Sequence, residues 1–168
     1  MSASPLARLL RAGLLTGVTD GLFSSVLAAA VYGSTVTRLW QGVASAVLGP
    51  AALTGGTRTA AFGLLLHFGV AFGWSAVFLA LYLGSRRLRE LTATPAGVAA
   101  AAAAYGPAIW LVMSLVVLPA LLHRPPTISA RWWVQVVGHV PFVALPIVAV
   151  IAGRAGPVER PTSAERAR

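Results

Sequence analysis

The stretch GLLTGVTDGLFSSVLAAAVYG, from Gly13 to Gly33, indicates what kind of fold the chain adopts. It contains one charged residue, Asp20, among residues that are otherwise apolar, small or hydroxyl-bearing. About 20 such residues make one helical crossing of a lipid bilayer. The stretch therefore predicts a transmembrane helix. It also raises the question of what Asp20 contacts, because an ionised carboxylate is costly in hydrocarbon.

The composition of the whole chain agrees with this interpretation. Of the 168 residues, 57% are hydrophobic and only 10% are charged, whereas a soluble domain has about 25% charged residues. The net charge of +9 comes from arginines at the ends of apolar runs, and no basic stripe with interleaved aromatic residues indicates nucleic-acid binding. The chain has no cysteine, which excludes disulfides and cysteine metal sites. We expect an all-α integral membrane protein.

Five apolar segments define the expected organisation. Four are long enough to span a bilayer: residues 9–32, 59–83, 96–122 and 132–152, all bounds being approximate. The remaining segment, about 39–54, is short and interrupted by Gly49 and Pro50, so we expect a short interfacial or re-entrant helix. Residues 1–153 are thus predicted to form a single transmembrane helical bundle, and the polar residues 154–168 a disordered cytoplasmic tail.

The arginines predict the orientation of this bundle. With four spans, nine arginines lie on the side of the N-terminus: Arg8, Arg11, Arg86, Arg87, Arg89, Arg154, Arg160, Arg166 and Arg168. Four lie on the other side: Arg38, Arg58, Arg124 and Arg131. The excess of positive charge on cytoplasmic loops predicts that both termini are cytoplasmic. Cleavage of the first helix as a signal peptide is the alternative, and the acid within its apolar region argues against it.

Three ionisable side chains lie within the expected spans: Asp20, His67 and His139. Counted from the nearest flanking arginines at 1.5 Å per residue, each lies about 12–14 Å into the bilayer. We therefore expect them to meet in an intramembrane polar cluster, since such groups normally face the interior of a bundle. Ser24, Ser75 and Gln135 lie on the same helix faces and are expected to support it.

The chemistry of this cluster stays open at this stage. A carboxylate beside imidazoles pairs with a protonated ring or orients a neutral tautomer. The cluster then either pins the helices through hydrogen bonds, relays protons, or accepts a polar ligand, a metal or a haem. We favour the hydrogen-bonded structural role, and we expect no metal and no cofactor.

Small residues and aromatic residues predict packing and anchoring. Glycines at four-residue spacing let helices approach closely, and we expect this of Gly13, Gly17, Gly21, Gly69 and Gly73. Tryptophans at the outer boundaries are typical of an aromatic belt, and an arginine there anchors by extending to the interface. The expected interface anchors are Arg38, Trp40, Trp132 and Trp133. Pro119, Pro141 and Pro146 are expected to kink or end helices.

From about Ala96 onward the chain resembles the YagU-type bacterial inner-membrane proteins, a family of largely unknown function. The residues that carry the resemblance are Pro119, Arg124-Pro125-Pro126, Trp132-Trp133 and Val137-Gly138-His139-Val140, preceded by Leu66-His67-Phe68. The resemblance implies a small multi-pass protein of the bacterial inner membrane.

No catalytic motif is present, and three of the four acidic residues lie near polar ends, so we expect no enzyme. Two classes of function remain. One is a structural or accessory membrane component with the polar cluster as its internal tie. The other is a small proton-linked carrier or channel that acts as an oligomer. The expected partners are the lipid bilayer and either a second copy of the chain or another membrane protein, not nucleic acid.

Overall fold

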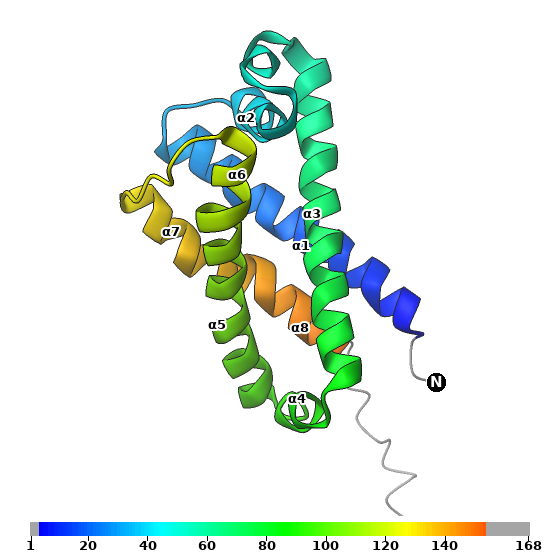
Figure 1. Ribbon diagram of the computed structural model, residues 1–168. Helices are drawn as coiled ribbons and strands as arrows, with labels where there is room; N and C mark the ends of the chain where they lie inside the picture. Colours follow the sequence, from blue (N-terminus) through cyan, green and yellow to red (C-terminus); the bar gives the residue numbers. More distant parts are fainter. Residues whose placement is uncertain (1–3, 154–168) are drawn as a thin grey trace, which may run out of the picture.

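The computed structural model describes residues 4–153, and these form helices and no strand (Figure 1). Four helical segments are long and apolar enough to cross a membrane: Pro5–Val31, Gly56–Gly84, Pro95–Leu122 and Ala130–Ile151. The prediction of an all-α integral membrane protein with four spanning helices is confirmed. The expected disordered tail, residues 154–168, lies outside the described residues.

The first crossing consists of α1, Pro5–Val26, and a π-helical turn, η1, Leu27–Val31. Its start is set locally, because the side chain of Ser4 accepts a hydrogen bond from the amide of Ala7 and proline occupies the first helical position. The crossing is several residues longer at its start than the 9–32 expected from hydropathy, because the N-cap and not the apolar boundary determines where a helix begins.

The short second segment forms α2, Val36–Leu48, followed by the 3₁₀ turn η2, Pro50–Thr54. A helix of 13 residues is only about 20 Å long, too short for a hydrocarbon core of about 30 Å. Gly49, at φ 73°, breaks the helix in a conformation that favours glycine. Figure 1 shows α2 packed across the end of the bundle that is opposite to the N-terminus.

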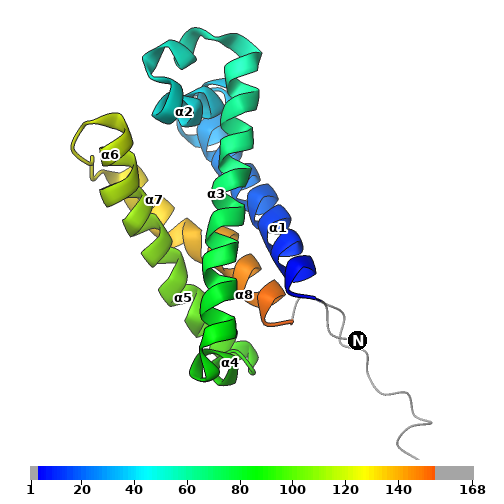
Figure 2. The same ribbon diagram turned by 45° about the vertical axis from the view of Figure 1, so that its right-hand side comes forward.

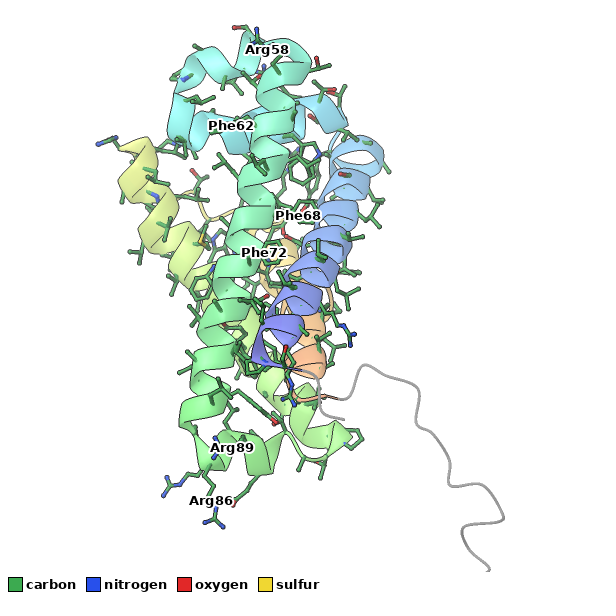
Figure 3. All side chains as sticks on the ribbon, turned by 90° about the vertical axis from the view of Figure 1, so that its right-hand side faces the viewer. Arg58, Phe62, Phe68, Phe72, Arg86 and Arg89 are labelled. Atoms are coloured by element: carbon green, nitrogen blue, oxygen red, sulfur yellow. The ribbon has the colours of Figure 1, made fainter. Side chains whose placement is uncertain are left out.

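The second crossing, α3, Gly56–Gly84, is one uninterrupted α-helix of 29 residues. At about 43 Å it is longer than the hydrocarbon core is thick. Figure 3 shows Arg58 at one end of α3 and Arg86 and Arg89 beyond the other. Arg86 begins the short helix α4, Arg86–Leu91, and the Nη1 of Arg89 donates to the carbonyls of Tyr82 and Leu83, at 2.9 and 2.7 Å.

The last two crossings both contain π-helical turns. One comprises α5, η3 and α6: Pro95–Val112, Met113–Val117 and Leu118–Leu122. The other comprises α7, η4 and α8: Ala130–His139, Val140–Ala144 and Leu145–Ile151. The helices continue through Pro119, Pro141 and Pro146. A π turn lies just before or around these prolines, which lack the amide proton of the regular ladder.

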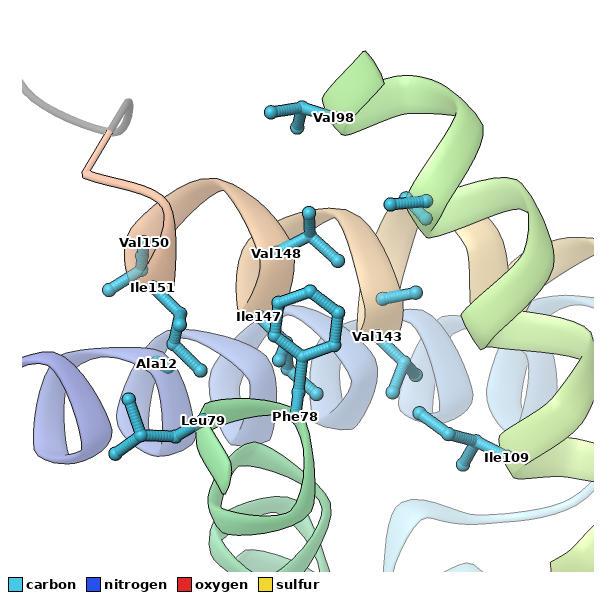
Figure 4. Close-up of a cluster of buried hydrophobic side chains, with 13 residues drawn as sticks. Ala12, Phe78, Leu79, Val98, Ile109, Val143, Ile147, Val148, Val150 and Ile151 are labelled. Atoms are coloured by element: carbon cyan, nitrogen blue, oxygen red, sulfur yellow. The ribbon is translucent and has the colours of Figure 1, made fainter. Parts of the chain in front are cut away.

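The two ends of the described chain lie together. The Nη1 of Arg8 donates to the carbonyl of Ile151, at 3.0 Å, and so binds the start of α1 to the last residue of α8. Figure 2 shows the α1–α3 and α5–α8 hairpins converging toward the end that carries α4. Near that end the hydrophobic core forms from α1, α3, α5 and α8, with Phe78, Ile147 and Ile151 fully buried (Figure 4).

Candidate functional site

Asp20 of α1 and His67 of α3 come together inside the helical part of the molecule. The Oδ2 of Asp20 lies 3.8 Å from the Nδ1 of His67, and the side chains are only 16% and 13% exposed. The separation is within ion-pair range but longer than a hydrogen bond. The other carboxylate oxygen, Oδ1, is buried and has no hydrogen-bond partner among residues 4–153.

The imidazole of His67 reaches α1 because α1 presents glycines there. Its Nε2 lies 3.0 Å from the backbone carbonyl oxygen of Gly17. A Cβ added to Gly21 would lie 3.4 Å from the same nitrogen, which is van der Waals contact, so Gly21 also borders the ring. On its other side the ring packs against the indole of Trp40, with ring centroids 5.0 Å apart. His67 thus connects three helices: α1, α2 and α3.

His139, on the fourth crossing, lies within electrostatic range of this pair. It is the last residue of α7 and is 8% exposed. Its Nδ1 lies 2.8 Å from the carbonyl oxygen of Gln135, one turn earlier, and its ring packs on that of Trp110 at 4.9 Å. Asp20 interacts electrostatically with both His139 and His67. The structure therefore pairs Asp20 with His67, and within residues 4–153 it shows no ion pair between His139 and Asp20. The predicted cluster of all three residues stays a prediction.

The three residues expected to support the cluster do not contribute their side chains to it. The hydroxyl of Ser75 is fully buried and donates to Ala71 of its own helix, at 2.8 Å. Ser75 lies eight residues beyond His67, or about 12 Å along α3. Gln135 takes part only through its backbone carbonyl. Ser24 is half-buried and makes no side-chain hydrogen bond within residues 4–153. For Ser75 the reason is depth, which a shared helix face does not specify.

The predicted glycine surface packs against a neighbouring helix on α1, whereas on α3 it meets no other helix of the described chain. Gly13 and Gly17 lie against the rings of Phe72 and Phe68, which would come within 2.2 and 2.4 Å of an added Cβ. Figure 3 shows both phenylalanines on the part of α3 beside α1. The glycines of α1 therefore form a shallow groove that accepts aromatic rings.

Gly69 and Gly73, by contrast, are exposed, and a Cβ on either would meet nothing within 4 Å. They face away because Phe68 and Phe72, one position earlier, occupy the side of α3 that meets α1.

The four residues predicted to be interface anchors differ in their exposure. Trp133 is 59% exposed, as an aromatic belt requires, but Trp40 and Trp132 are buried at 7% and 8%. Trp40 packs on His67, and the indole N–H of Trp132 donates to Ser114, at 3.0 Å. Arg38 is exposed, and its Nη1 donates to the carbonyl of Leu53, at 2.8 Å. It therefore joins α2 to the following 3₁₀ turn.

Sequence reasoning missed two threonines that bind α1 to η4. The hydroxyl of Thr19 donates to the carbonyl of Phe142 at 2.6 Å, and that of Thr16 to the carbonyl of Val143 at 3.4 Å. Phe142 is four residues before Pro146, which has no amide proton, so its carbonyl lacks the usual helical donor. Pro146 was the available signal: a proline inside a span frees a carbonyl that a neighbouring hydroxyl satisfies.

Two further observations concern access and ligands. A cavity of about 180 Å³ lies between the α5–α6 crossing and the start of α7, with Trp110, Ser114, Arg124 and Trp132 among its lining residues. Trp110 lines this cavity and also packs on the ring of His139. Within residues 4–153 no three histidine or acidic side chains are grouped as ligands for a metal ion.

Comparison of the chain with protein-family models, curated proteins and solved structures finds no match.

Proposed function

We propose that the protein is a structural or accessory component of a membrane, in which the Asp20–His67–His139 cluster ties the helices of the bundle together. The hydrogen bond between His67 of α3 and the Gly17 carbonyl of α1 carries this proposal. Helices in lipid gain little from the hydrophobic effect when they associate, so packing and interhelical hydrogen bonds hold them together.

The other polar contacts of α1 support the same role. Thr16 and Thr19 donate to carbonyls of η4, and Arg8 donates to the carbonyl of Ile151. These donors reach backbone carbonyls of neighbouring helices, which is the arrangement of an internal tie. They run from the start of α1 to its middle, so α1 is bound to the last crossing over much of its length.

Replacement of His67 tests this proposal. His67→Phe keeps a ring but removes the donor to Gly17, and we expect it to lower the stability of the bundle in lipid by about 1 kcal/mol. His67→Gln retains an N–H donor and is expected to recover part of the loss. The measurement is unfolding in lipid nanodiscs, followed by circular dichroism. Equal stability of the three proteins would rule out a structural role for this bond.

A second candidate function is a small proton-linked carrier or channel that acts as an oligomer. Two observations favour it: within residues 4–153 the buried Asp20 Oδ1 has no hydrogen-bond partner, and Trp110, which packs on His139, lines a cavity of about 180 Å³. Asp20→Asn should then abolish proton flux into proteoliposomes loaded with a pH-sensitive dye. Flux that is absent from the unmodified protein, or equal in the two proteins, would leave only the structural role.

The setting of the protein is also a proposal. We place it in the bacterial inner membrane with both termini cytoplasmic, supported by the nine arginines against four and by the resemblance to the YagU-type proteins. We assign it no catalytic activity, because the sequence contains no catalytic motif. Its partners are lipid and, for the carrier function, further copies of the chain.

A further inference from the structure

We infer that Asp20 and His67 are a proton-binding site: together they hold one proton more than an ionised carboxylate and a neutral imidazole would. The inference deepens the proposed function and rests on it for the place of the cluster within the bilayer. It follows from which ring nitrogens carry hydrogen.

The backbone carbonyls identify those nitrogens. A carbonyl oxygen only accepts hydrogen bonds, so the Nε2 of His67, 3.0 Å from the carbonyl of Gly17, carries a hydrogen. The Nδ1 of His139, 2.8 Å from the carbonyl of Gln135, carries one for the same reason. A neutral imidazole has a single N–H. In each neutral ring, therefore, the hydrogen is engaged by a backbone carbonyl and the other nitrogen has only a lone pair.

The nitrogen of His67 that faces Asp20 is the one without hydrogen. Nδ1 lies 3.8 Å from Oδ2, and an ionised carboxylate is also purely an acceptor. Two acceptors facing each other repel. Oδ1 has no donor either, so an ionised Asp20 beside neutral rings would be a buried and unpaired charge. Such a charge is strongly disfavoured in hydrocarbon.

No arginine of residues 4–153 relieves this conflict. The charges that act on Asp20 from the described residues are those of His67 on α3 and His139 on α7. From α2 the neighbour of His67 is Trp40, which is uncharged. One added proton removes the conflict in either of two ways. Either a protonated Asp20 presents an O–H to the lone pair of Nδ1, or a protonated Nδ1 faces the carboxylate at ion-pair distance. In both cases the Asp20–His67 pair has no net charge.

The composition of the chain makes the test direct. Asp20 is the only aspartate, and the three histidines are His67, His123 and His139. His123 is exposed and has φ 51°. His123→Asn removes it with a residue that tolerates this conformation. Full-length protein with ¹³C-aspartate and ¹⁵N-histidine, in lipid bilayers at neutral pH, then reports on these groups alone by infrared and solid-state NMR spectroscopy.

We expect either a protonated aspartate carbonyl band, or a carboxylate band with one doubly protonated imidazole. A carboxylate band together with two singly protonated imidazoles would overturn the inference. Asp20→Asn supplies the second measurement: it should leave His67 singly protonated at Nε2, a loss of one proton per chain if the ring held it before. A ring that stays doubly protonated in this variant would show that Asp20 does not share the proton.

The inference and the proposed function fail separately. A shared proton with no loss of stability in His67→Phe would refute the structural role alone. A loss of stability in His67→Phe, with no added proton in the unmodified protein, would refute the proton-binding site alone. If Asp20→Asn does not fold, the spectra of the unmodified protein still decide the question.

Discussion

At the scale of single residues, hydroxyl groups and an imidazole donate hydrogen bonds to backbone carbonyls of neighbouring helices, and the same imidazole faces the buried acid Asp20. Sequence reasoning could place Asp20, His67 and His139 at a common depth, because helical rise and flanking arginines suffice for that estimate. It could not give the tautomers, because these depend on the carbonyls of Gly17 and Gln135 and on the angles at which the helices cross.

Thr19 provides a prediction at this scale. Thr19→Val keeps the shape of the side chain and removes the donor to the carbonyl of Phe142, which Pro146 leaves without its helical partner. We expect a loss of about 1 kcal/mol, in the range measured for interhelical hydrogen bonds in membranes. The measurement is unfolding in lipid nanodiscs.

The same substitution at Thr37, an exposed residue of α2, is the matched control. We expect it to leave stability nearly unchanged. Equal effects at the two positions would mean that the bond to Phe142 contributes nothing.

At the scale of helices, one very close approach between two helices is not identified by the glycine spacing. A Cβ on Gly63 of α3 would lie 1.8 Å from the carbonyl oxygen of Trp40, on the backbone of α2. Gly63 is isolated, whereas Gly69 and Gly73 form the recognisable four-residue pattern. Glycines at four-residue spacing permit two helices to pack closely. The spacing does not show which side of a helix faces protein and which faces lipid.

Gly63 and Gly69 therefore form a matched pair of tests. Gly63→Ala should force α2 away from α3 and cost about 3 kcal/mol, as severe overpacking does. Gly69→Ala meets open space and should be neutral or stabilising by up to about 1 kcal/mol, because alanine is the better helix former. Thermal unfolding in lipid gives both values.

Fluorescence of Trp40 in a variant from which the other tryptophans are removed reports on whether α2 has moved. Unchanged stability and unchanged fluorescence in Gly63→Ala would contradict the crossing of α2 and α3 described above.

The π turns are a second feature of the helices that sequence patterns do not predict. They occur in three of the four crossings, over Leu27–Val31, Met113–Val117 and Val140–Ala144. The composition of these segments is ordinary for a membrane helix. Pro119, Pro141 and Pro146 lie in or near the second and third of these turns, whereas no proline lies near Leu27–Val31. Hydropathy therefore locates the crossings but not the places where their backbone departs from an α-helix.

At the scale of the whole molecule, the turn that follows the second crossing and the loop that precedes it lie at opposite ends of the bundle. The α4 turn lies at the end where α8 finishes, and Arg58 lies at the other (Figures 1 and 3). Many large apolar side chains, such as Leu65, Val137 and Leu22, are more than 60% exposed, as lipid-facing residues should be. The number of crossings and the exposed apolar surface followed from composition, because both depend only on the thickness and polarity of the bilayer.

Labelling of single cysteines tests this topology, and the chain is well suited to it because it has no cysteine of its own. Thr57→Cys and Thr127→Cys should react with a membrane-impermeant maleimide from one side of the membrane. Ala93→Cys, in the turn after α4, should react only from the other side. Our proposed orientation places Thr57 and Thr127 outside. Reaction of all three variants from one side would contradict the four-span topology.

The contact between Arg8 and Ile151 indicates that the order of the helices along the chain could be changed by circular permutation. Since the first and last helices meet, a short linker could join them, and the chain could be opened instead in the turn between α4 and α5. In such a circularly permuted protein the α5–α8 hairpin would leave the ribosome first. The α1–α3 hairpin would then be synthesised second instead of first. The contacts between the helices would stay the same.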